Sequence, residues 1–105
     1  MSVIRRPLLS PHLQSGKLVE RMQITHIELP PGEPTGLHVH PVPVVGYILT
    51  GRIQFQIDGQ APLSLDAGDA FYEPAGLRIL HFDNLSRAEP ATFVAVYLLG
   101  ANDRS

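Results

Sequence analysis

The sequence predicts an all-β fold built from short strands. Ten prolines and nine glycines are spread over 105 residues, which favours frequent turns and disfavours long helices. Segments rich in β-branched residues lie between these turn signals, and Arg52–Ile57 alternates cleanly between apolar and polar residues. Short strands at regular spacing, separated by turns, are typical of a β-sandwich or a small barrel.

The elements follow in chain order. Residues 1–16 show no sustained period and contain Pro7, Pro11 and Gly16, so we expect an irregular N-terminal arm. A single domain is expected over residues 17–99, followed by a flexible tail at 100–105. Asp58-Gly59 is the dipeptide that tight two-residue hairpins prefer. The expected strands cover residues 17–29, 37–40, 44–49, 52–57, 60–65, 70–73, 77–82 and 91–99.

The bulk composition excludes several classes of protein. Hydrophobic residues make up 44% and charged residues 17%, with a net charge of -2, which is a normal globular balance. No cationic cluster exceeds Arg5-Arg6, so we expect no nucleic-acid partner. The absence of cysteine excludes disulfides and Cys-based zinc sites. No signal peptide or membrane span is evident, so a cytoplasmic protein without a membrane partner is expected.

His38 and His40 are the only closely spaced histidines in the chain. In an extended segment, residues two apart point to the same face, so both imidazoles project side by side. Two interpretations stay open at this point. The pair either binds one metal ion or lines a polar pocket.

Two spaced motifs resemble those of a known family. Gly32, His38, His40 and Gly51 fit the first cupin motif, in which a glycine precedes a His-x-His pair and a second glycine follows it. Gly68, Pro74, Gly76 and Asn84 fit the second cupin motif. The sequence thus resembles small single-domain cupins of the RmlC-like jelly-roll type. The resemblance implies a double-stranded β-helix, folded as a jelly-roll barrel or sandwich, and a homodimer.

The sequence departs from the metal-binding pattern of that family at two positions. Val44 stands where the first motif has glutamate, and Ile79 stands where the second motif has histidine. His81 lies two residues after Ile79 and is expected on the same face of its strand, where a bulge could bring it nearer. The hypothesis is therefore a three-histidine site of His38, His40 and His81 that holds zinc, iron, nickel or copper weakly.

Three functions follow from these observations. The first is a small-molecule-binding cupin with a reduced metal site, in which the two aliphatic replacements favour a partly apolar ligand. The second is a three-histidine metal enzyme of the cupin dioxygenase type. The third is a metal-free enzyme that resembles sugar epimerase cupins and uses a histidine base. The predicted pocket lining is His38, His40, Val44, Gln54, Glu73, Ile79 and His81.

Overall fold

The computed structural model describes residues 2–105 and contains only β-strands as regular elements in that part of the chain. All the expected strands are present, with small shifts at their ends. The first residue of the expected arm, Met1, lies outside the described residues. The strands are β1 (Arg21–Leu29), β2 (His38–Val39), β3 (Val44–Thr50), β4 (Arg52–Ile57), β5 (Leu63–Asp66), β6 (Ala70–Glu73), β7 (Arg78–Asn84) and β8 (Ala91–Leu99).

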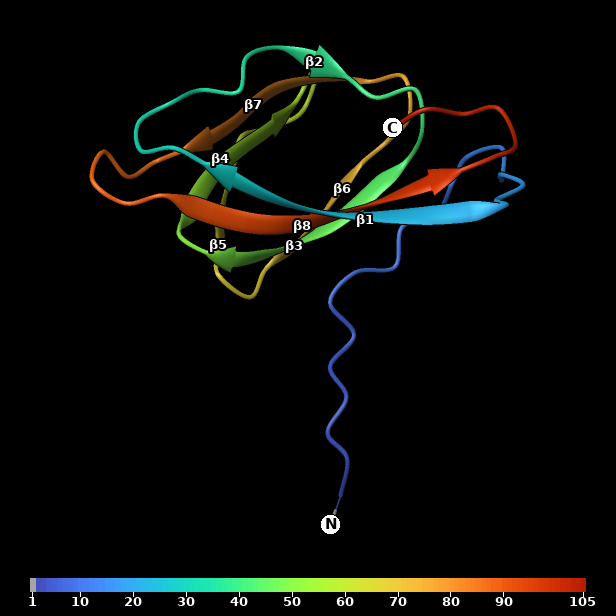
Figure 1. The fold of residues 1–105 in the computed structure, drawn as a ribbon, viewed down its shortest axis with the longest axis horizontal. Helices are drawn as coiled ribbons and strands as arrows, with labels where there is room; N and C mark the ends of the chain where they lie inside the picture. Colours follow the sequence, from blue (N-terminus) through green and yellow to red (C-terminus); the bar gives the residue numbers. More distant parts are fainter. Residues whose placement is uncertain (1) are drawn as a thin grey trace.

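The strands form two four-stranded sheets, as the all-β jelly-roll prediction requires (Figure 1). One sheet has the order β1-β8-β3-β6, and the other has the order β2-β7-β4-β5. Every strand pair is antiparallel. Neighbours in each sheet are mostly far apart in sequence, so each sheet brings together side chains that no local pattern connects.

The core lies between the two sheets and follows the period-2 alternation of the strands. In β8, buried and half-buried residues alternate along the whole strand, because successive side chains point to opposite faces. Phenylalanines from both sheets meet in the centre, with ring centroids 4.9 Å apart for Phe71 and Phe82 and 4.7 Å apart for Phe82 and Phe93. Burial of each such side chain contributes about 1.5–3 kcal/mol.

Gly46 of β3 lets one of these rings approach the backbone. A Cβ atom at this position would lie 2.2 Å from the nearest Phe71 ring atom. Only a residue without a side chain therefore fits beneath the Phe71 ring.

The Asp58-Gly59 turn is present, but the hairpin is longer than the sequence predicts. The N–H of Gln60 donates to the carbonyl of Ile57 at 3.0 Å, and Gly59 has a φ of 84°. Pairing resumes only at Leu63, because Pro62 has no N–H to donate to a ladder. The returning strand is consequently shorter than expected.

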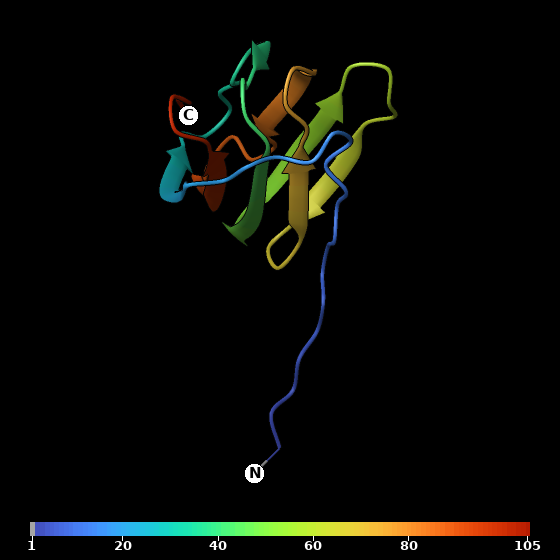
Figure 2. The same cartoon turned by 90° about the vertical axis from the view of Figure 1, so that its right-hand side faces the viewer.

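The arm and the tail flank the two sheets. The beginning of the described chain stands clear of the strands in both views (Figures 1 and 2), and no strand begins before Arg21 in residues 2–105. In the tail, the carboxylate of Asp103 accepts hydrogen bonds from the Gly100 N–H and from Lys17. No helix that could cross a membrane is found within the described part of the chain.

Candidate metal centre

His38 and His40 lie at one end of the space between the sheets. His38 belongs to β2, where it is paired with Ile79 of β7, and His40 follows directly after that strand. Their ring centroids are 5.0 Å apart, with the ring planes at 75°. The two-residue spacing therefore places both imidazoles on the same face, as the sequence predicts.

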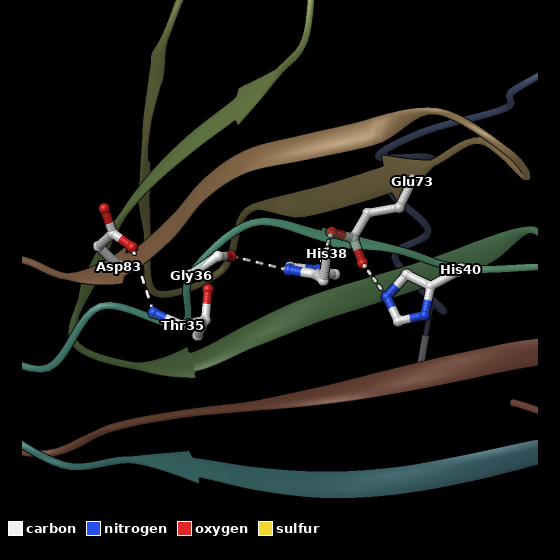
Figure 3. Close-up of polar contacts among 6 residues, drawn as sticks. All are labelled: Thr35, Gly36, His38, His40, Glu73 and Asp83. Carbon is white, nitrogen blue, oxygen red and sulfur yellow. Dashed lines mark hydrogen bonds and ion pairs between the residues drawn. The ribbon is translucent and has the colours of Figure 1, made fainter.

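Glu73 supplies a carboxylate between the two imidazoles (Figure 3). One carboxylate oxygen lies 3.3 Å from His38 Nε2, and the other lies 3.1 Å from His40 Nε2. The Glu73 side chain is only 5% exposed. A nearly buried carboxylate needs compensating partners, and the two histidines provide them.

The register of β3 and β6 explains where this carboxylate comes from. Glu73 is the residue directly opposite Val44 in the β3–β6 pair, and Val44 occupies the glutamate position of the first motif. Side chains of directly opposed residues lie on the same face of a sheet, with Cβ atoms about 4.5–5.5 Å apart. The carboxylate missing from β3 is thus supplied by the neighbouring strand. The sequence predicts Glu73 as a pocket residue but not as a metal ligand.

The loop before β2 fixes the orientation of the His38 ring. His38 Nδ1 lies 3.2 Å from the backbone carbonyl of Gly36 (Figure 3), so the Nδ1–H donates to this carbonyl. Gly36 has a φ of 77°, a backbone conformation that glycine adopts without steric cost. With Nδ1 carrying its proton, Nε2 is the ring atom presented to Glu73. Such a bond from the second ring nitrogen is typical of metal-binding histidines.

The charges of the three groups are coupled. Burial raises the pKa of Glu73, but the hydrogen bonds from His38 and His40, together with their charges, outweigh burial and hold it below its usual value. The hydrogen bond to Glu73 raises the pKa of His38 above its ordinary value, against the opposing effect of burial. The protonated form of His38 and the ionised form of Glu73 therefore stabilise each other.

A cavity of about 320 Å³ opens beside the three groups. Apart from the ligand set, its lining is mostly apolar and aromatic. Burial and the nearby charge of Glu73 raise the pKa of Tyr97, so its phenol remains protonated at neutral pH. The lining residues are Ile27, Leu29, Thr35, His38, His40, Glu73, Phe82, Phe93, Ala95 and Tyr97.

The structure does not bring His81 to the histidine pair. The register between β4 and β7 shifts between Gln56 and Ile57, which face His81 and Ile79 respectively. This bulge adds one residue, so Phe82 rather than His81 is buried after Ile79. His81 donates instead from Nδ1 to Asp83 at 2.8 Å and its side chain is 45% exposed. The expected three-histidine set is therefore replaced by His38, His40 and Glu73.

The other predicted pocket residues lie in two places. Val44 and Ile79 are fully buried, and as register partners of Glu73 and His38 they pack beside the site as apolar support. Gln54 alternates with the buried Ile53 and Phe55 of β4, so it lies on the opposite face of its sheet and does not line the cavity.

The donor set fits a divalent transition metal. One nitrogen of each histidine and one oxygen of Glu73 all lie within 4.8 Å of one another. Zinc binds histidine nitrogen and carboxylate oxygen at about 2.0–2.2 Å. Imidazole nitrogen together with carboxylate oxygen also suits iron, nickel and copper.

Comparison with known proteins agrees with this fold. Residues 25–97 match the family model described as the cupin domain. A search of curated proteins finds no match to the sequence. Among solved structures, a protein from Thermus thermophilus is 30% identical, with a TM-score of 0.64, over 78% of this chain and 76% of that one.

Two further structures carry functional names. A predicted oxalate decarboxylase from Thermotoga maritima is 29% identical, with a TM-score of 0.63, over 73% of this chain and 65% of that one. DMSP lyase DddQ from Ruegeria pomeroyi DSS-3 is 20% identical, with a TM-score of 0.68, over 79% of this chain and 41% of that one. At that identity the second likeness concerns the fold alone. The family match over most of the chain shows that this protein belongs to the cupin family.

Proposed function

We propose that this cupin binds one divalent transition metal ion through His38, His40 and Glu73, and that the metal holds a small, partly apolar, oxygen-bearing ligand. The observation that carries the proposal is the nearly buried Glu73 carboxylate, which contacts both imidazoles at 3.3 and 3.1 Å in the wall of a cavity. Three protein ligands leave coordination positions for a ligand from the cavity. When bound, such an ion supplies a Lewis acid or a redox centre.

Other residues of the chain orient the proposed metal ligands and form the walls of the cavity. The Gly36 carbonyl holds the Nδ1 proton of His38 and so leaves Nε2 as the ligand atom. Phe82 and Phe93 form an apolar wall, which limits the access of water to the site and strengthens its electrostatic interactions. The protonated phenol of Tyr97 is a neutral hydrogen-bond donor on the cavity wall.

The structural comparison supports one part of this proposal, the small oxygen-bearing ligand. The Thermotoga protein, which is named for chemistry on a small carboxylate, is 29% identical to this chain. The chain spans less than two thirds of that protein, so the activity in its name is not carried over to this cupin. The likeness supports a small oxygen-bearing ligand without choosing the reaction.

A metal-free acid–base enzyme of the sugar epimerase type is the second candidate. It is supported by the direct contact between His38 and Glu73, with the raised pKa of His38, because a carboxylate that contacts an imidazole is a common arrangement for general-base catalysis. The small apolar cavity offers few polar groups to a sugar. The three-histidine dioxygenase alternative depends on His81, which lies outside the cavity.

Metal stoichiometry separates the two candidates. The untagged protein is stripped, loaded with Zn²⁺ and measured for metal content and affinity. We expect one ion per chain, and a loss of at least about 100-fold in affinity for Glu73→Gln and for His40→Ala, since even weaker perturbations around a metal cost about 10–100-fold. His81→Ala is the matched control and leaves affinity unchanged. Unaltered binding by His40→Ala, or no binding by the wild-type chain, contradicts the metal proposal.

A further inference from the structure

The cavity lining contains no cationic side chain that could pair with a ligand, among the residues that the structure describes. Its titratable members are the three proposed metal ligands and Tyr97, whose phenol is uncharged. Arg78, which is the first residue of β7 and is paired with Val39, binds Asp58 and does not line the cavity. Any negative charge on a bound ligand must therefore be compensated by the metal centre alone.

The charge of that centre is fixed by its ligands. A divalent ion with two neutral imidazoles and the ionised Glu73 has a net charge of +1, because metal-bound histidines are neutral. A monoanion brings the site to zero. A dianion leaves a net negative charge against apolar walls, and burial of an uncompensated charge is strongly unfavourable.

The rest of the lining favours an apolar body on the ligand. Ile27, Leu29, Phe82, Phe93 and Ala95 surround the space beside the ligand set. Contact with these side chains removes apolar ligand surface from water, which is favourable in proportion to the buried area. The volume of about 320 Å³ lies at the lower end of the range for small-molecule sites, about 300–1,000 Å³.

We propose that the ligand is a small monoanionic chelator with an apolar body, such as a 2-oxo carboxylate with a branched alkyl group, and not a dianion such as oxalate. This inference rests on the proposed metal centre. The proposed ligand therefore differs from oxalate, the compound in the name of the Thermotoga protein. The apolar body lies against the two phenylalanines, and its carboxylate and oxo oxygens face the metal ligands.

The test compares three ligands on the zinc-loaded protein by calorimetry. Oxalate is a dianion, glyoxylate is a monoanion without an apolar body, and 3-methyl-2-oxobutanoate is a monoanion with one. We expect 3-methyl-2-oxobutanoate to bind at least about tenfold more tightly than glyoxylate, since each buried methylene is favourable. Oxalate should bind more weakly than 3-methyl-2-oxobutanoate. Tighter or equal binding of oxalate to the metal-loaded chain overturns the proposal.

A charge-adding variant tests the electrostatic part. Ile27→Lys places a cation in the lining and is expected to increase oxalate affinity by about tenfold or more. His26→Lys adds the same charge to the outer face of the same strand and is expected to have no effect. No gain for Ile27→Lys, in a folded and metal-loaded variant, contradicts the charge argument. Metal content is measured before and after each titration, so failure of the metal centre is distinguished from failure of the ligand inference.

Discussion

Moving the carboxylate between paired strands tests how the metal centre is built. Val44 and Glu73 are direct register partners in β3 and β6, so exchanging them keeps one glutamate and one valine at adjacent positions on one face. Glu73→Val removes one of the three proposed ligands. The double variant Val44→Glu/Glu73→Val restores a carboxylate from the opposite strand, at the position that the first cupin motif assigns to glutamate.

The expected magnitude follows from the ligand set and from burial. Loss of a ligand should weaken Zn²⁺ binding by at least about 100-fold, or roughly 2.7 kcal/mol. The Cβ atoms of directly opposed residues are only about 4.5–5.5 Å apart, a gap that a glutamate side chain spans, so the double variant should recover at least about tenfold of that loss.

The metal-free protein should also be affected. Glu73 is 4% exposed, and removing one partner of a buried ion pair is destabilising. Glu73→Val should therefore lower the melting temperature of the stripped protein and abolish the increase that Zn²⁺ causes. Calorimetric melting with and without Zn²⁺, together with metal competition, measures both effects. No recovery in a folded double variant would refute the register argument.

Three further predictions concern the pH dependence and the packing. The ion pair of His38 and Glu73 stabilises the metal-free protein only while Glu73 is ionised and His38 is protonated. Because the pKa of Glu73 is lowered, the melting temperature should fall as the pH drops below about 4.5, the ordinary glutamate value. Because the pKa of His38 is raised, the melting temperature should also fall as the pH rises above 6.5, the ordinary histidine value. Zn²⁺ displaces the His38 proton, so its affinity should rise with pH over the same upper range, as titrations at several pH values would show. Gly46→Ala should destabilise the fold by about 1–3 kcal/mol in urea unfolding, because Phe71 must move; an unchanged midpoint would contradict this packing.

The sequence reveals the strands because their signals are local. The alternation of Arg52–Ile57 and the turn residues predict β4 and its neighbours, and the two-residue spacing of His38 and His40 correctly places both rings on one face. The same alternation assigns Gln54 to the face opposite Phe55, so its exclusion from the cavity was already readable from the sequence.

The third ligand could not be read in this way, because it depends on which residues face each other across strands. Glu73 is far from the histidines in sequence, and only the β3–β6 register brings it to the position next to Val44. The prediction for His81 is wrong for the opposite reason. In a regular strand His81 and Ile79 would lie on the same face, but the bulge in β7 places them on opposite faces.

The position of Glu73 has a consequence for how degenerate motifs are interpreted. Directly opposed residues on two adjacent strands can place a side chain at the same buried position. A ligand carboxylate can therefore move from one strand to the other through two single replacements. The intermediate with glutamate on both strands keeps a ligand at every step, although two neighbouring carboxylates raise the pKa of one of them. A motif search that follows a single strand misses the moved carboxylate and classifies the site as lost. Cupins with an aliphatic residue at the glutamate position should therefore be searched for an acidic residue directly across the sheet.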